Sequence, residues 1–251
     1  MVKYLNMISL RYTHPLVLSL CLLFFNCQPS KTTQNDSLMT VKGSVVGLRK
    51  GTLYLQKMQD TLLVSVDSTT VNGTPNFLFQ TPIETDEVFY LYLDKEDGDS
   101  LNDRILFFGE KGEIEINTLL KTFESSAQIT GSKNQELLQE YIAFSRKFND
   151  QNLELMEDFY KAQMAQNTER ADSIQKKINN LLKRRYLYTI NFAANNTDKN
   201  IAPYLALTQV YDAKLALLDS IAVKMTPQVR DSKYGKEFIN YLEQRRATPE
   251  N

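Results

Sequence analysis

The sequence predicts an α+β fold, in which an antiparallel β-sandwich or barrel-like sheet is followed by an all-helical C-terminal region. From Met39 to about Ile129, short apolar runs recur with a period near two and end close to Gly, Asp or Pro, which is typical of half-buried strands. After Gly131 the apolar residues recur every three to four positions, the helical period. We therefore expect a β-sandwich domain over residues 39–131 and a helical domain over 132–251.

The N-terminal domain is expected to contain seven or more short strands joined by tight turns. Two of them, Thr40–Val45 and Thr52–Gln56, flank a glycine-bounded turn at residues 47–51 and form a hairpin. Asn72-Gly73 marks another tight turn. The remaining candidates are rich in β-branched or aromatic residues and cover Leu62–Thr70, Phe77–Phe79, Val88–Leu93, Ile105–Phe108 and Ile114–Ile116. Such a series favours an antiparallel sandwich or a barrel-like sheet.

The C-terminal region is expected to hold four to six helices and to open with an antiparallel helical hairpin. The first helix carries an apolar stripe that extends from Leu137 to Tyr160. The second runs from about Thr168 to Ala194 and ends at the polar pair that follows. Pro203 and Pro227 stand where the first turns of later helices would begin, a position that proline favours.

Residues 1–26 have the layout of a secretory leader. Lys3 and Arg11 precede an apolar run from Leu16 to Phe25. This run is about ten residues long, whereas a membrane-spanning helix needs roughly 20. We therefore expect a signal peptide that is removed, and no membrane helix.

The end of the leader, Leu23–Cys27, resembles the lipobox of bacterial lipoproteins, although Phe24 and Asn26 depart from its commonest residues. The resemblance implies that Cys27 is acylated with chains such as palmitate and becomes the first residue, while residues 27–38 form a flexible tether. A plain secretory signal or a free cysteine is the alternative. Because no Asp follows Cys27, the resemblance favours an outer-membrane lipoprotein facing the periplasm, with the cell surface as the other location.

The reactive side chains are few. The chain has one histidine, His14, and two cysteines, Cys21 and Cys27. After processing we expect no histidine and no free thiol, which excludes His- or Cys-based nucleophiles, a Cys-x-x-Cys redox pair and His or Cys metal sites. The sequence thus predicts a protein that is not an enzyme, with no catalytic residue, no metal and no cofactor. Its 29 basic and 30 acidic residues lack the basic excess of a nucleic-acid-binding protein.

The β-rich segments resemble a known bacterial module. The residues that carry the resemblance are Val41–Leu48, Gly51–Leu55, Val66–Gly73, Ile129–Asn134 and Ser232–Gly235. They are similar to an uncharacterised N-terminal domain, a domain of unknown function, that precedes a thioredoxin-like module in lipid-anchored thiol–disulfide interchange proteins. The resemblance covers residues 39–246 and implies a small β-sheet unit followed by a helical region. No Trp-Cys-x-x-Cys motif is present, so we expect the accessory half without the thioredoxin module.

Two candidate sites are weighed against simpler interpretations. Asp94–Asp99, with Asn102 and Asp103, is the densest acidic cluster and offers oxygen ligands of the kind that Ca²⁺ prefers. It fails the EF-hand spacing, and a solvated loop between strands is the simpler interpretation. Ser173 and Lys176 have the spacing of serine acyl-enzymes, but the partner motifs are missing, which favours coincidence in a helix.

Three surface patterns have weaker implications. Lys176-Lys177 and Lys183–Arg185 could meet phosphate-rich lipid or an acidic partner, although a solvated helix face explains them as well. The tyrosines could line a groove or pack in the core: Tyr186, Tyr188, Tyr204 and Tyr211. Three tripeptides resemble a bacterial O-glycosylation acceptor: Asp67-Ser68-Thr69, Asp172-Ser173-Ile174 and Asp219-Ser220-Ile221.

The leading hypothesis is a non-catalytic, lipid-anchored envelope protein that binds a protein or a ligand. The membrane is its expected partner through the lipid on Cys27, with an envelope protein as a second partner, and the family resemblance suggests support of a thioredoxin-like redox system. One alternative is a carboxylate-based hydrolase of envelope glycans, which needs two facing acidic groups separated by roughly 5–10 Å. The other is a binder of small hydrophobic ligands, which needs an apolar pocket between sheet and helices.

Overall fold

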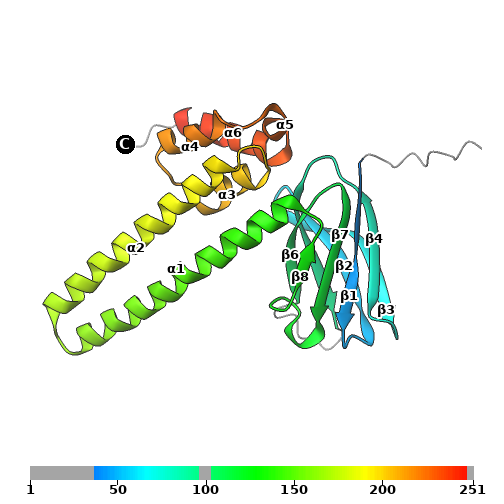
Figure 1. The fold of residues 1–251 in the computed structure, drawn as a ribbon, viewed down its shortest axis with the longest axis horizontal. Coiled ribbons are helices and arrows are strands. Elements are labelled where there is room, and N and C mark those ends of the chain that lie inside the picture. Colours follow the sequence, from blue (N-terminus) through cyan, green and yellow to red (C-terminus); the bar gives the residue numbers. More distant parts are fainter. Residues whose placement is uncertain (1–36, 96–102, 248–251) are drawn as a thin grey trace, which may run out of the picture. The chain divides into compact units, whose positions relative to one another are not determined.

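A computed structural model describes residues 37–95 and 103–247. The expected leader, Cys27 and the tether up to residue 36 lie outside the described residues, as do residues 96–102 of the acidic cluster. Within the described part, eight strands precede six α-helices, which confirms the α+β fold class (Figure 1).

The strands form two four-stranded sheets. The first has the order β4-β1-β7-β8 and consists of β4 (Asn76–Pro82), β1 (Leu38–Val46), β7 (Gly112–Leu119) and β8 (Gln128–Thr130). The second has the order β3-β2-β5-β6 and consists of β3 (Leu62–Asn72), β2 (Lys50–Gln59), β5 (Glu87–Asp94) and β6 (Arg104–Gly109). The sheets are antiparallel except for the parallel pairing of β1 with β7. The expected hairpin of the first two strands is therefore wrong, because β1 and β2 lie in different sheets.

One apolar core is shared by the two sheets. Val41 and Ile114 come from the first sheet, and Leu53, Leu91 and Phe107 come from the second; all five are fully buried. Along β2 and β7, alternate residues are buried in this core, as the period of two predicts. The sheets therefore pack as a sandwich, and burial of their inner faces supplies its main driving force.

Gly131 marks the change from strand to helix. Its φ of +96° lies in the left-handed region, and a Cβ at this position would stand 2.1 Å from the carbonyl oxygen of Glu113. Only glycine avoids both the strain and this clash. The chain can therefore turn sharply between β8 and the first helix, which begins two residues later at Lys133.

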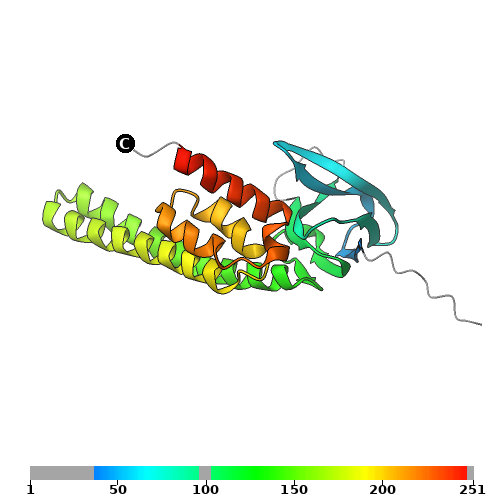
Figure 2. The same cartoon turned by 90° about the horizontal axis from the view of Figure 1, so that it is seen from above.

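The C-terminal region is helical throughout. Its α-helices are α1 (Lys133–Met164), α2 (Thr168–Asn195), α3 (Ile201–Gln209), α4 (Leu215–Ala222), α5 (Pro227–Arg230) and α6 (Lys233–Ala247). A short 3-10 helix, η1 (Leu120–Thr122), lies earlier, between β7 and β8. The first two α-helices are antiparallel neighbours, as expected (Figures 1 and 2). They begin at side-chain caps on Ser132 and Asn167. Across residues 37–95 and 103–247, none of the helices combines the length and apolar character that crossing a bilayer requires.

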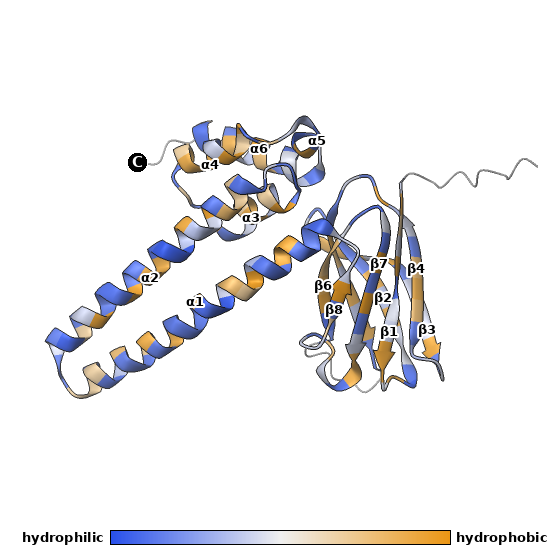
Figure 3. Ribbon diagram, in the orientation of Figure 1, coloured by the Kyte–Doolittle hydropathy of each residue, from blue (hydrophilic) through white to orange (hydrophobic). Residues whose placement is uncertain are grey.

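Three apolar clusters organise the helices. Ile190 of α2, Ala206 of α3 and Phe238 of α6 belong to the core of the C-terminal helices. A second cluster, with Phe159 of α1 and Ile174 of α2, holds the far end of the hairpin together. Along both hairpin helices hydrophobic residues alternate with hydrophilic ones, so that a limited face is apolar (Figure 3).

The third cluster joins the sheet to the helices. Val88 of β5 and Phe108 of β6 pack with Leu138, Phe192 and Leu205 from three helices. Phe108 also meets the rings of Tyr204 and Tyr234 edge-on, with centroid distances of 5.4 and 6.1 Å. The outer face of the second sheet is therefore a packed contact with α1, α2, α3 and α6.

Candidate functional site

The end of the β4–β5 connection and the start of β5 make several polar contacts with the helical region. Four successive residues of this segment, Thr85 to Val88, each bond to residues beyond Gly131. Thr85 Oγ1 accepts a hydrogen bond from the backbone N–H of Lys233 at 3.4 Å, and the backbone N–H of Val88 donates to the Tyr234 hydroxyl at 3.0 Å. We call residues 85–88 the junction segment.

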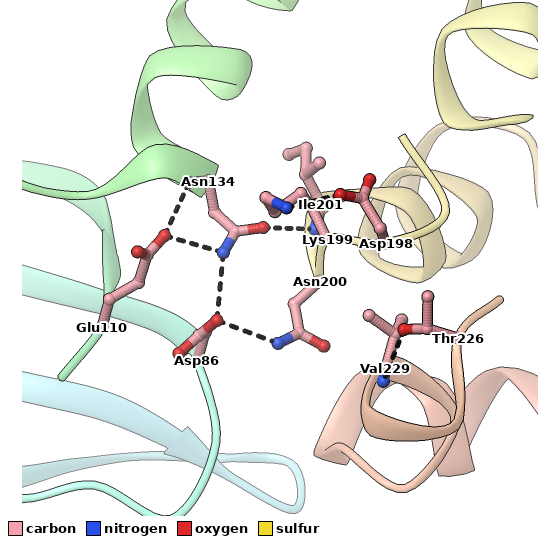
Figure 4. A network of polar contacts seen from close by, with 9 residues as sticks. All are labelled: Asp86, Glu110, Asn134, Asp198, Lys199, Asn200, Ile201, Thr226 and Val229. Carbon is pink, nitrogen blue, oxygen red and sulfur yellow. Dashed lines mark hydrogen bonds and ion pairs between the residues drawn. The ribbon is translucent and has the colours of Figure 1, made fainter. Parts of the chain in front are cut away.

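Asn134 is the central residue of one network at this junction (Figure 4). It is buried, and its amide nitrogen donates to Glu110 Oε1 at 2.7 Å and to Asp86 Oδ2 at 3.2 Å. Its amide oxygen accepts from the backbone N–H of Ile201 at 2.8 Å. Asn200 completes the network through a bond of 3.1 Å to Asp86 Oδ2. The side chain of Asn134 thus connects the sheet to the first turns of both α1 and α3.

Glu110 is hydrogen-bonded to the first residues of α1 and to the Ser132 cap before it. Its carboxylate accepts hydrogen bonds from Ser132 Oγ at 2.8 Å and from the backbone N–H groups of Lys133 and Asn134 at 3.1 and 2.6 Å. These N–H groups have no partner inside the helix, and a negative charge at this end is favoured by the helix dipole. Glu110 therefore fixes where α1 leaves the sandwich.

Glu87 forms the second network, one residue after Asp86. Its side chain is 7% exposed, and its two oxygens accept from Lys57 Nζ at 2.7 Å and Lys233 Nζ at 2.6 Å. Lys233 also donates to the carbonyl oxygen of Met58 at 2.9 Å. A buried carboxylate is tolerated when charged donors satisfy it in this way. The ion pairs join β2, β5 and α6.

Burial shifts the pKa of several groups at the junction. It raises the pKa of the Asp86 carboxyl, and the charge of Glu110 adds to this, while the amide donors of Asn200 and Asn134 act in the opposite direction. Burial also raises the pKa of Tyr204 to about 12, so that this phenol stays neutral at physiological pH. The pKa of Glu237 is raised mainly by burial, against the opposing charge of Lys233.

Several hollows lie at the contact of sheet and helices. The Glu87 cleft, of about 730 Å³, is lined by Lys57, Glu87, Tyr90, Tyr204, Lys233 and Glu237. A larger hollow of about 980 Å³ lies between the loop after β7 and the first half of α1. A third, of about 380 Å³, lies between β6, α1, α2 and α3. These volumes lie within the range that is typical of small-molecule binding sites.

Asp103 of the acidic cluster forms an ion pair within the described part. Asp103 is buried, and its Oδ2 lies 3.0 Å from Lys95 Nζ. No group of three or more His, Cys, Asp or Glu side chains able to hold a metal ion occurs within residues 37–95 and 103–247.

The other candidates of the sequence are dispersed. Ser173 and Lys176 are exposed on α2, and the basic residues of that helix are exposed except for Arg185, which is half-buried. Tyr204 lines hollows and also packs on Phe108, so both interpretations apply to it. Tyr186 and Tyr188 pack against apolar clusters, and Tyr211 is exposed. The acceptor hydroxyls of the glycosylation pattern, Ser68, Ser173 and Ser220, are exposed, and their modification stays a prediction.

Sequence reasoning missed Asp86, Glu87, Glu110 and Asn134. The sequence held a weak indication of Glu87 and of Asn134. Glu87 directly precedes the apolar run of β5, and Asn134 follows the Ser132 cap. Neither position reveals its partners, because these come from segments up to 146 residues away in the chain.

Comparison with known proteins gives one match. Residues 39–138 match the family model of a domain of unknown function (DUF4369). This supports the resemblance to an uncharacterised domain, and the matched region includes Asp86, Glu110 and Asn134. No curated protein and no solved structure matches the chain.

The Asn134 network leads to a stability prediction. Asn134→Ala would leave the Ile201 N–H without its partner and remove a donor from both carboxylates. We expect the free energy of unfolding to fall by about 2–4 kcal/mol in urea denaturation. Asn179→Ala is the matched control, because Asn179 is exposed on α2 and accepts a bond from Gln175; it should cost no more than about 0.5 kcal/mol. Equal losses for the two variants would contradict the role of Asn134.

Asp86 leads to a prediction about pH. An acid whose pKa is raised on folding stabilises the folded state below its ordinary pKa of 3.8, and this contribution is lost as the pH rises through the raised value. The Asp86→Asn variant has no carboxyl to ionise at this position, so it does not lose stability in this way. Its free energy of unfolding, relative to that of the wild type, should therefore increase with pH. Urea denaturation between about pH 3 and pH 7 measures this. Asp172→Asn, at an exposed site on α2, is the control; a constant difference between Asp86→Asn and the wild type would refute the assignment.

Proposed function

We propose that this chain is a non-catalytic binding protein of the cell envelope. It is held to the outer membrane by lipid on Cys27, faces the periplasm and binds its partner or ligand where the sheet meets the helices. The leader and the lipobox-like Leu23–Cys27 support the anchor. The hollows at the sheet–helix contact support a binding role.

The non-catalytic role is supported by the hydrogen bonds of the carboxylates at the junction. Both oxygens of Glu87 are bonded to lysine ammonium groups, and Glu110 is bonded to the first turn of α1. A carboxylate held in this way is fixed in position by charge-assisted hydrogen bonds or by the backbone N–H groups of a helix. It is poorly placed to attack a substrate, and its main effect is on the geometry of the junction.

The hydrolase of envelope glycans is the competing function, and one observation favours it. Glu87 and Glu237 line the same cleft, and burial raises the pKa of Glu237, as a general acid would require. The lysine pairs of Glu87 weigh against it. Release of new reducing ends from envelope glycans by the purified chain, lost in Glu237→Gln, would favour the hydrolase over the binding role.

A finer proposal concerns the partner. We infer support of a thioredoxin-like redox system from the family resemblance of residues 39–246. Residues 37–251 contain no cysteine, so any thiol chemistry would belong to the partner.

Cys27→Ala tests the anchor. Loss of the acyl acceptor should remove most of the protein from the outer-membrane fraction and abolish the acyl mass on its N-terminus. Density separation of membranes and mass spectrometry of the mature N-terminus measure the two effects. Cys21→Ala is the matched control, since Cys21 lies inside the expected leader and its loss should change neither result. An unacylated wild-type protein in the cytosol would disprove the anchor.

Cross-linking in intact cells tests the partner. The wild-type chain should enrich a thioredoxin-like lipoprotein several-fold over the Cys27→Ala variant, because only the anchored form shares its membrane. Mass spectrometry of the cross-linked species identifies the proteins. Enrichment without any thioredoxin-like protein would make the redox proposal wrong while leaving the anchor intact.

A further inference from the structure

The hollow of about 380 Å³ between β6, α1, α2 and α3 differs in chemistry from the others. Its apolar side chains come from the sheet, from α1 and from α3: Leu106, Leu138, Tyr141, Ile142, Tyr204 and Leu205. Leu138 and Leu205 are buried, whereas Ile142 is 37% exposed and reaches the rim. The interior is therefore suited to an apolar group.

Two arginines border this hollow, which we call the arginine pocket. Arg146 extends from α1 and Arg185 from α2. No Asp or Glu lines it, whereas carboxylates line both the Glu87 cleft and the larger hollow beside α1. The arginine pocket thus combines an apolar interior with uncompensated positive charge.

Neither arginine is paired with an acidic side chain in the described structure. Arg185 Nη1 donates to Asn149 Oδ1 at 3.3 Å, and neither guanidinium forms an ion pair within residues 37–95 and 103–247. A guanidinium offers several donors in a planar fork that matches carboxylate and phosphate oxygens. The two side chains are therefore available to an anionic ligand.

A polar group inside the pocket is also unsatisfied. The hydroxyl oxygen of Ser145 is buried and has no hydrogen-bond partner among the described residues. Ser145 lines the arginine pocket one residue before Arg146. Because buried hydroxyls are nearly always hydrogen-bonded, this one has the capacity to bond a ligand.

We propose that the arginine pocket binds an anionic amphiphile, a small molecule with a carboxylate or phosphate head and an aliphatic body. The head lies between Arg146 and Arg185, and the aliphatic body packs on Leu106, Leu138 and Leu205. This inference rests on the proposed binding role and gives it a ligand class. It is independent of the anchor on Cys27, which a separate experiment tests.

The experiment uses the full chain purified in a non-ionic detergent and native mass spectrometry. The probes are decanoate and decyl phosphate, with decanol as the neutral analogue and decylamine as the cationic one. We expect one molecule of decanoate or decyl phosphate to be retained per chain, and neither decanol nor decylamine. Preference between the two anions identifies the head group. Equal retention of decanol and decanoate, or retention of neither anion, would overturn the proposal.

Variants locate the bound ligand. Arg146→Gln and Arg185→Gln should each weaken retention of the preferred anion about tenfold, the loss expected for one charge-assisted bond. Arg170→Gln is the matched control, because Arg170 is exposed near the start of α2 and does not line the pocket. Ile142→Trp should block the pocket while leaving both arginines in place. Circular dichroism verifies that each variant is folded; unchanged binding in the folded Ile142→Trp and Arg146→Gln/Arg185→Gln variants would place the ligand elsewhere and refute the site.

Discussion

Burial of the Glu87 carboxylate, beside the half-buried Asp86, is the constraint on which the rest of the structure depends. Removing acidic side chains from water is costly unless donors replace the lost hydration. The sandwich supplies Lys57, but the other donors come from the helices, above all Asn134, Asn200 and Lys233. The start of β5 can therefore be buried only when the helices are in place. Because one strand end requires donors from α1, the start of α3 and α6, folding of the sheet is coupled to that of the helical region.

This coupling explains why the hollows lie where they do. Polar bonds fix the sheet to α1, α3 and α6 at the junction segment, and the aromatic contacts of Phe108 with Tyr204 and Tyr234 fill the space beside it. Between these contacts the helices and the outer face of the second sheet leave hollows. The matched domain of residues 39–138 contributes one wall to each of these hollows, and in two of them the later helices contribute the other. A binding surface at this place thus requires both regions of the chain.

The sequence predicts the fold better than the site, for a physical reason. Strands and helices are local, so the change of period near Gly131 and the stripe of α1 were enough to predict the sandwich and the hairpin. The parallel pairing of β1 with β7 was not predictable, because strand order depends on contacts between distant segments. The same holds for Glu87, whose partners Lys57 and Lys233 lie 30 and 146 residues away. Arg185 was noticed as part of a basic run, but its position at an apolar pocket follows from how α1, α2 and α3 pack.

The charges at the junction and those at the arginine pocket have different consequences. At the junction, Glu87 and Glu110 are bonded to lysines or to backbone N–H groups, so their charge is used to hold the structure together. At the arginine pocket, Arg146 and Arg185 have no acidic partner among the described residues, so their charge is not used internally. A charge that is neutralised within the fold contributes little to recognition, whereas an unpaired guanidinium beside apolar surface favours a complementary anion. Recognition by this chain is therefore expected to depend on its arginines more than on its more numerous carboxylates.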